Sequence, residues 1–179
     1  GLDFLNEFSE PTTVIIKHNN ACGVASSTTV NKSFIKAFNC DKKSAFGGVI
    51  LINRKINEDL AKLIINNFFE VLVSPAFTKN ALRILSKKKN LILINSTKIP
   101  KAKTEIIKSV RLGTLVQKNN NFKFSKNNFN IVSKNNKLSK REFDDILFAF
   151  KIVKHTKSNA IVLVKNKQTV GIGAGQMNR

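Results

Sequence analysis

Residues 14–23 read VIIKHNNACG, and this stretch decides how the chain folds. Residues 14–16 are β-branched and have the composition of a buried strand. Residues 19–23 include two Asn and a Gly, which tolerate the unusual backbone angles of turns. The strand is therefore predicted to end at Lys17 and His18, where side chains in open α/β sheets reach into a ligand crevice. Because neighbours within a strand point to opposite faces, both side chains can face one site only if the strand has ended.

This Lys–His pair is the first candidate for chemistry. Histidine exchanges a proton near neutral pH, so His18 can act as a general base. An adjacent ammonium, here Lys17, can stabilise a developing oxyanion. The alternative is a histidine that simply ends a strand, because a Lys–His pair arises easily by chance in a chain with 26 lysines.

The net charge of +20 raises the possibility of a nucleic-acid-binding module. However, only five of the 31 basic residues are Arg, the residue preferred for base and phosphate recognition. The chain also holds 23 Asn and 19 Ile, which share A- and T-rich codons with Lys. A biased genome therefore explains the composition better than selection for polyanions, although the charge should still attract anionic substrates.

Length and cysteine content limit the class of protein. The 179 residues suffice for one domain with a genuine core. No apolar run approaches the ~20 residues of a membrane span, and no secretory leader is visible. Two cysteines without a CxxC spacing predict neither a disulfide framework nor a zinc cluster, so we expect a cytoplasmic protein. The start at Gly1 and a single methionine, Met177, lead us to expect a piece of a longer protein.

Apolar runs alternate with helical patterns through the first half of the chain, which predicts βαβ units and a sheet covered by helices. Asn57 is the expected N-cap of one helix, whose apolar face includes Phe68, and Leu82 is expected to point inward from another. The predicted strands are Thr13–Lys17, Gly48–Ile52, Glu70–Ser74 and Leu91–Ile94, and the predicted helices lie at Val30–Phe38, Asn57–Phe68 and Thr78–Lys88.

The second half is less regular. A strand is predicted at Val110–Gln117, a loop or a loose hairpin at Lys118–Asn130, and a short strand near Asn130–Ser133. Ser139 and Glu142 form a capping box before a long amphipathic helix. The inward residues of that helix are expected to be Phe143, Ile146, Leu147, Phe150 and Val153, and two strands are predicted to follow it, at Asn159–Val164 and Thr169–Ile172.

Other candidate residues carry weaker signals. His155 is predicted to be structural, since it ends the long helix, where a positive charge suits the helix dipole. Nothing in the sequence requires a reactive thiolate at Cys22, and no metal is expected. The glycines at 45–48 and 171–175 indicate tight turns or close approach of the backbone to a ligand. Asn159 opens a predicted strand and could orient a polar substrate through its amide.

Five blocks of sequence, taken together, resemble a known family in order and spacing. They are VIIKHNNACGVA, SAFGGVILINR, FFEVLVSPAF with ALRILSKKKN, KHTKSNAIVLVKN and TVGIGAGQMNR. They resemble the AICAR transformylase part of the bifunctional purine-biosynthesis proteins, in which it is joined to IMP cyclohydrolase. The resemblance runs from about Thr13 to Arg179. It implies an α/β fold, a cytidine-deaminase-like three-layer subdomain without zinc, with a mixed sheet and helices on its faces.

The resemblance also implies a reaction and residue roles. The family transfers a formyl group from 10-formyltetrahydrofolate, a co-substrate, to the 5-amino group of the nucleotide AICAR. His18 matches the family's proton acceptor and Lys17 its transition-state stabiliser. The positions that match AICAR-binding residues are Asn159, Gly47, Glu70 and Arg179.

The resemblance has departures as well. Ala21 stands where the family motif usually has Pro, which is expected to loosen the turn after Lys17 and His18. Residues 1–179 correspond to the first transformylase subdomain, without the cyclohydrolase domain or the second subdomain. Because the family's active sites form across a homodimer interface, we expect this piece to be inactive by itself. A basic nucleic-acid-binding module and a decayed, non-catalytic homologue remain the alternatives; neither a membrane nor a nucleic acid is the expected partner.

Overall fold

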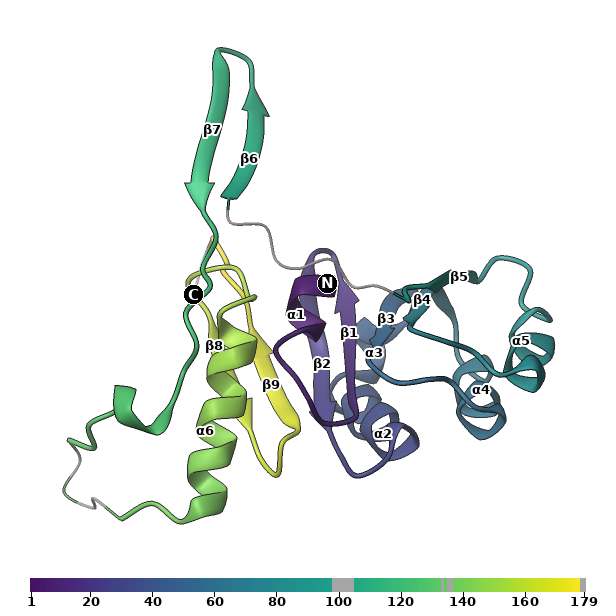
Figure 1. The fold of residues 1–179 in the computed structure, drawn as a ribbon, viewed down its shortest axis with the longest axis horizontal. Helices are drawn as coiled ribbons and strands as arrows, with labels where there is room; N and C mark the ends of the chain where they lie inside the picture. Colours follow the sequence, from purple (N-terminus) through teal and green to yellow (C-terminus); the bar gives the residue numbers. More distant parts are fainter. Residues whose placement is uncertain (98–104, 133, 135–136, 178–179) are drawn as a thin grey trace.

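The centre of the molecule is a five-stranded mixed sheet in the order β2-β1-β3-β4-β5. The computed structural model describes residues 1–97, 105–132, 134 and 137–177 (Figure 1). Strand β1 runs antiparallel to both of its neighbours, whereas β3, β4 and β5 are parallel. The strands are β1 (Thr12–Lys17), β2 (Asn20–Ser26), β3 (Gly48–Ile52), β4 (Phe69–Ser74) and β5 (Ile92–Asn95).

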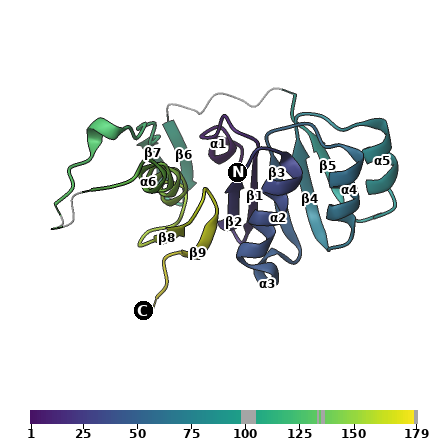
Figure 2. The ribbon, with the colours of Figure 1, turned by 90° about the horizontal axis from the view of Figure 1, so that it is seen from below.

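One face of the sheet is covered by helices α2 to α5 (Figure 2). Their apolar residues pack on Ile15, Ile50 and Leu72, which alternate with residues that point to the other face. Asn57 caps α4 as predicted, because its side chain accepts a hydrogen bond from Leu60 N. The helices are α2 (Val30–Cys40), α3 (Lys42–Ala45), α4 (Glu58–Ile65) and α5 (Lys79–Leu85).

Two side chains assigned to these helices' inner faces lie elsewhere. Leu82 is 43 % exposed, because α5 turns Ala81 and Leu85 towards the core instead. Phe68 is also exposed, at 41 %, since α4 ends at Ile65 and leaves Phe68 in the link to β4. Helical spacing in the sequence continues beyond the point where the backbone stops being helical.

The opposite face of the sheet carries α1 (Leu2–Leu5) and α6 (Lys140–Val153). The capping box of Ser139 and Glu142 is present, as predicted. The predicted inward face of α6 was wrong in part, since the two residues that it buries fully are Phe148 and Ile152. On the face of α6 that was predicted to be buried, Phe150 instead contacts the rings of Phe124 and Phe129, which lie in the segment before the helix. A helix that packs between two apolar partners has two apolar faces, whereas a single hydrophobic pattern in the sequence indicates only one of them.

A hairpin of β8 (Ile161–Val164) and β9 (Thr169–Gly173) lies beside the outer edge of β2 (Figure 1). The hydroxyl of Thr169 accepts a hydrogen bond from Val24 N at 2.9 Å and donates to Val24 O at 3.1 Å. Ser26 N also donates to Lys167 O. These contacts bring the end of the chain next to the strand that follows His18.

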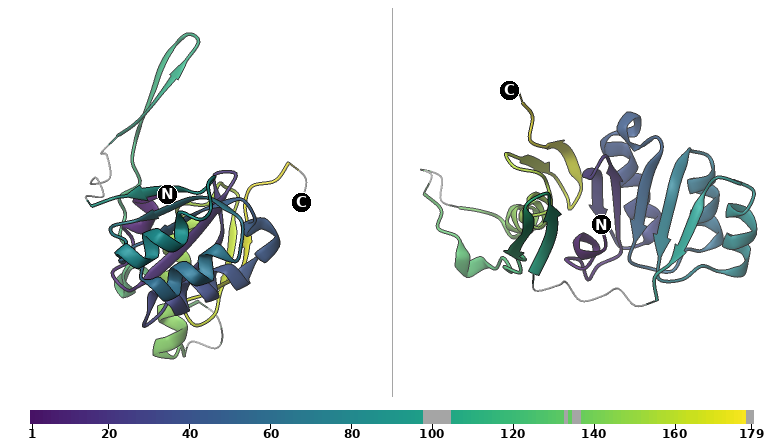
Figure 3. Two further views of the ribbon diagram at one scale, coloured as in Figure 1. Left: turned by 90° about the vertical axis from the view of Figure 1, so that its right-hand side faces the viewer. Right: turned by 90° about the horizontal axis from the view of Figure 1, so that it is seen from above.

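A second hairpin, β6 (Glu105–Val110) and β7 (Gly113–Lys118), projects away from the body (Figures 1 and 3). The strand predicted at Val110–Gln117 is present from Gly113 onward as β7, but its start was wrong, because a turn at residues 111–112 separates Val110, which ends β6. Residues 119–132 contain a 3-10 turn at Lys126–Asn128 and no strand, so the short strand predicted there was also wrong as far as residue 132. Ser133, the last residue of that prediction, lies outside the described residues.

The sheet between helices on both faces confirms the predicted mixed α/β architecture. The more specific cytidine-deaminase-like classification stays a prediction. No helix in the described ranges combines the length and the apolar composition that a bilayer span requires.

Candidate active site

The strand β1 ends at Lys17, as predicted, and the chain reverses through a two-residue turn. His18 and Asn19 have φ angles of +51° and +64°, and Lys17 pairs with Asn20 across the turn. Positive φ at both central residues matches the turn type that fits the twist of a hairpin. The turn holds His18 beyond the end of the strand with its side chain exposed. The imidazole is thus accessible to a ligand.

Two of the expected turn residues belong to a strand instead. Asn20 and Gly23 lie in β2, and Ala21 pairs with Ile16 and is buried. Gly23 is required for packing, because a Cβ there would lie 2.0 Å from the carbonyl oxygen of Ala37 in α2. The turn therefore closes before Ala21, the residue expected to loosen it.

Lys17 meets two of the other predicted site residues. Its Nζ donates a hydrogen bond to the carbonyl oxygen of Gly47 at 2.8 Å and lies 4.0 Å from Oε1 of Glu70. Gly47 has a φ of +65°, and a Cβ there would lie 2.9 Å from Lys17 Nζ. Glycine is thus needed at 47 both for its backbone angle and for the room that the ammonium occupies.

Glu70 reaches this cluster because of a β-bulge. Gly48 pairs with Phe69 and Val49 pairs with Val71, so Glu70 is the extra residue of β4. A bulge redirects the side chains around it, and this one places an exposed carboxylate beside Lys17. An ammonium has three donors, so Lys17 can bind a substrate oxygen while it keeps its bond to Gly47.

Asn159 lies in the loop between α6 and β8, and its Oδ1 accepts a hydrogen bond from the hydroxyl of Ser158. The loop is tied to the hairpin, since Lys157 N donates to Oδ1 of Asn20 at 3.2 Å. Asn159 thus comes from a segment that contacts the strand after His18. Arg179, the remaining predicted site residue, lies outside the described residues.

Two exposed aromatic residues beside the cluster were missed in the sequence. The rings of Phe46 and Phe68 lie 5.0 Å apart and are 65 % and 41 % exposed. Gly47 N donates to Phe68 O, which fixes this pair beside Lys17. Phe46 adjoins the predicted glycine turn, and this neighbourhood was the feature of the sequence that could have indicated Phe46 as a site residue. The pair offers an apolar surface on which a planar ring could stack.

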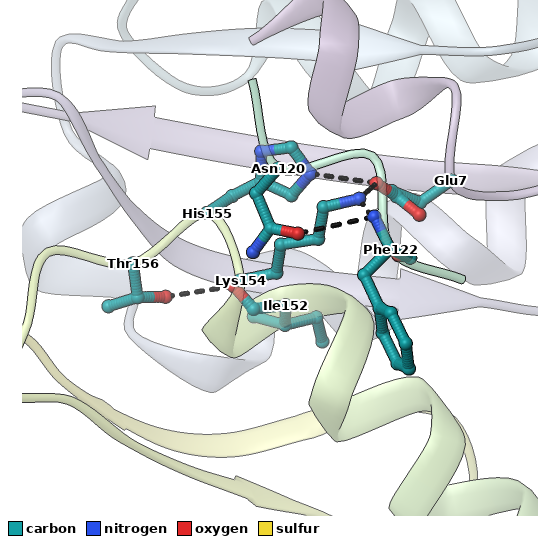
Figure 4. A network of polar contacts seen from close by, with 7 residues as sticks. All are labelled: Glu7, Asn120, Phe122, Ile152, Lys154, His155 and Thr156. Atoms are coloured by element: carbon teal, nitrogen blue, oxygen red, sulfur yellow. Dashed lines mark hydrogen bonds and ion pairs between the residues drawn. The ribbon is translucent and has the colours of Figure 1, made fainter. Parts of the chain in front are cut away.

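His155 lies in a different network, as its predicted structural role requires (Figure 4). Its Nε2 lies 3.1 Å from Glu7 Oε1, and its ring stacks on Phe4 at 4.7 Å. Lys154 Nζ donates to the same carboxylate oxygen at 2.6 Å. Burial raises the pKa of Glu7, but the hydrogen bonds from His155 and Lys154 together outweigh it, and the net pKa is lowered. The network joins α1 to the end of α6.

Cys22 is unsuited to be a nucleophile. Burial, with added repulsion from Asp41 and Cys40, raises the pKa of its thiol to about 12. The thiolate is therefore scarce at neutral pH. Within the part of the chain that the structure describes, no three His, Cys, Asp or Glu side chains are grouped so that they could hold a metal ion.

Comparisons with known proteins agree over the whole chain. A family model described as the AICARFT/IMPCHase bienzyme matches residues 1–179. The bifunctional purine biosynthesis protein PurH of Acetivibrio thermocellus is 44 % identical over 99 % of this chain and 35 % of its own length. The PurH proteins of Chlorobium phaeobacteroides and Bacillus subtilis are 45 % and 41 % identical, over 98 % and 99 % of this chain and 34 % and 35 % of their own lengths.

This chain thus spans about one third of the length of these curated relatives, with 35 % of the Acetivibrio protein covered. The match includes the hairpin with Lys17 and His18, the glycine turn at 47 and the loop with Asn159. The chain therefore belongs to the AICARFT/IMPCHase bienzyme family.

Proposed function

We propose that this chain supplies the acyl-transfer residues for moving a formyl group from 10-formyltetrahydrofolate to the 5-amino group of AICAR, a step in the synthesis of IMP. In this proposal His18 is the general base and Lys17 the electrostatic stabiliser. Gly47, Glu70 and Asn159 bind the nucleotide, with Arg179 as a further contact. Family membership and the gathering of Lys17, Gly47 and Glu70 support this assignment.

The observation that carries the proposal is the Lys17 ammonium held on a carbonyl oxygen, beside an exposed histidine in a two-residue turn. The amino nitrogen of AICAR attacks the formyl carbon, and the carbonyl oxygen gains negative charge. Lys17 stabilises this charge, and His18 accepts the proton that the nitrogen loses. The intermediate then expels N10 of tetrahydrofolate, which takes up a proton as it leaves.

Phe46 and Phe68 add a surface that suits this chemistry. Both co-substrates carry planar heterocycles, and exposed aromatic rings bind such rings by stacking. We further propose that transfer requires a polypeptide of the length of the relatives, acting as a cytoplasmic homodimer, and that the isolated chain is inactive.

The test is a formyl-transfer assay on the whole polypeptide that carries this chain, with AICAR and 10-formyltetrahydrofolate. Lys17→Met keeps the length of the side chain and removes its charge, so kcat should fall by at least about 100-fold. Lys62→Met is the matched control, because Lys62 also pairs with a carboxylate, Glu58, but on the exposed surface of α4.

Three outcomes decide the proposal. Loss of transfer in Lys17→Met, with Lys62→Met active, supports it. Equal rates in both variants would refute the role of Lys17. A wild type that transfers no formyl group would point to a decayed homologue, or to the basic nucleic-acid module if it also binds RNA with a steep salt dependence.

A further inference from the structure

The loop that carries Asn159 is held from two sides at one residue, Lys157. Its N–H donates to Oδ1 of Asn20 at 3.2 Å. Its carbonyl oxygen accepts a hydrogen bond from Gly175 N at 2.8 Å. Lys157 is separated from Asn20 by 137 positions in the chain, so the first bond ties the loop to a distant hairpin.

The contact between Gly175 and the Asn159 loop is close. A Cβ on Gly175 would lie 2.4 Å from the carbonyl oxygen of Ser158 and 3.3 Å from Asn159 N. Glycine therefore lets the segment after β9 press against the loop from that side. With the segment on one side and Asn20 on the other, the loop has little room to shift.

Asn20 is well placed to set the position of the loop. It is the first residue of β2 and pairs with Lys17 across the turn, so its backbone is fixed to the strand that presents Lys17. A side chain on such a backbone has few degrees of freedom to lose when it forms a hydrogen bond. Its amide oxygen meets Lys157, two residues before Asn159.

We propose that Asn20 is a positioning residue, which holds the Asn159 loop at a fixed place relative to Lys17 and His18. This inference rests on the proposed function, in which Asn159 binds the nucleotide and the hairpin performs the chemistry. Asn20 touches neither the substrate nor the reacting atoms. Its effect is to keep the binding loop and the catalytic turn in register, because small misplacements of binding groups are costly.

The test compares three variants of the whole polypeptide that carries this chain. Asn20→Ala removes the acceptor for Lys157 N–H, whereas Asn20→Asp keeps an acceptor oxygen at the same distance from the backbone. Asn19→Gly is the matched control, since it changes the neighbouring Asn, which lies in the turn, and glycine suits its φ of +64°.

Two readouts separate the inference from the proposed function. The first, amide exchange at Lys157, needs no activity; it should be about fivefold faster in Asn20→Ala and unchanged in Asn20→Asp and Asn19→Gly. The second is formyl-transfer kinetics, in which KM for AICAR should rise about fivefold in Asn20→Ala with kcat nearly unchanged. Asn20→Asp should restore KM, which a role in fold stability alone does not predict.

Each contrary result has a definite meaning. Unchanged exchange at Lys157 in Asn20→Ala would overturn the inference, whatever the activity. Faster exchange with an unchanged KM would also overturn it, while the proposed function stands. An inactive wild type would overturn the proposed function and this inference together.

Discussion

At the scale of single residues, Gly47 has the most demanding position in the candidate site. Its positive φ turns the chain into β3, and its carbonyl oxygen accepts the hydrogen bond from Lys17. The absence of a side chain leaves room for that ammonium and for the carboxylate of Glu70, since a Cβ would lie 2.9 Å and 3.3 Å from the two groups. Gly47 thus forms the turn into β3, accepts the hydrogen bond from Lys17, and leaves room for the two charged groups.

We predict that Gly47→Ala lowers formyl transfer at least about tenfold and destabilises the fold by about 1–2 kcal/mol, because it both strains the backbone and displaces Lys17. Gly113→Ala is the control, since Gly113 also has a positive φ, of +152°, but a Cβ there meets nothing within 4 Å. Transfer rates and urea unfolding of both variants check this. Equal loss of activity in the two variants would mean that the space beside Lys17 is unimportant.

Single residues also show what the sequence could and could not reveal. Lys17 and His18 were visible because a β-branched run stops where a turn begins, and both signals are local. The placing of Glu70 beside Lys17 depends on a bulge between two strands, which no local pattern encodes. The bond from Lys157 to Asn20 joins residues 137 positions apart and was equally hidden.

At the scale of elements, the packing of α2 on β2 requires a glycine inside the strand that follows the turn. The carbonyl oxygen of Ala37 approaches β2 at Gly23, five residues after His18. This close approach explains a glycine inside a strand, where it is otherwise unfavourable. The sequence pattern placed Gly23 in a turn because it contains no information on the helix that crosses it.

We predict that Gly23→Ala destabilises the protein by about 2–4 kcal/mol, since its Cβ would overlap backbone that cannot move aside cheaply. Gly171→Ala is the matched strand control, because the nearest atom to a Cβ there is a side-chain carbon of Leu163 at 3.6 Å. Denaturant midpoints measure the difference. Similar midpoints for the two variants would contradict the close packing of α2 on β2.

The contact between α1 and α6 leads to a prediction on pH. The hydrogen bonds from His155 and Lys154 lower the pKa of Glu7 against the effect of burial. A lowered carboxyl pKa stabilises the fold above the pKa of the unfolded chain, and this stability is lost as the pH falls through the folded value. Unfolding free energy should therefore fall more steeply between about pH 6 and pH 3 in the wild type than in Glu7→Gln.

Urea unfolding at a series of pH values measures this slope. Asp3→Asn serves as the control, because it removes a carboxylate from α1, four positions before Glu7, and leaves the Glu7 network in place. Its slope should match that of the wild type. Identical slopes for the wild type and Glu7→Gln would show that the ionised Glu7 contributes nothing to the link between α1 and α6.

At the scale of the whole molecule, the β6–β7 hairpin is set apart from the body that carries the candidate site (Figure 3). Every residue of its two strands is exposed, including Ile107 and Val116, which pair across it. A two-stranded hairpin without a covering layer is marginally stable in water. The five-stranded sheet, by contrast, has apolar cores on both faces.

We predict that amides of β6 and β7 exchange with solvent at least about 100-fold faster than those of β1 and β3 in the isolated chain. Hydrogen exchange resolved by residue measures both sets in one sample. Comparable protection of the hairpin would contradict its separation from the body.

The same division by scale explains how far the sequence predicted the fold. Strands β1, β3 and β4 and the caps at Asn57 and Ser139 rest on local signals, and the structure contains all of them. The predictions that were wrong include the burial of Leu82 and Phe68, the inner face of α6, and the assignment of Asn20 and Gly23 to a turn, all of which depend on partners distant in the sequence. The start of the strand at Val110 and the short strand near residue 130 were wrong as well. Local chemistry predicted the elements, and tertiary contacts determined which faces they bury.

Whether His18 is the general base is tested by the rate of tetrahydrofolate release from 10-formyltetrahydrofolate and AICAR, for the wild-type polypeptide that carries this chain and for its His18→Asn variant. Asparagine tolerates the φ of +51° at this position, so the turn should survive while the base is lost. We expect a rate at least about 100-fold lower in His18→Asn, because the proton acceptor is lost. A variant rate within about threefold of an active wild type would contradict the assignment of His18 as the general base.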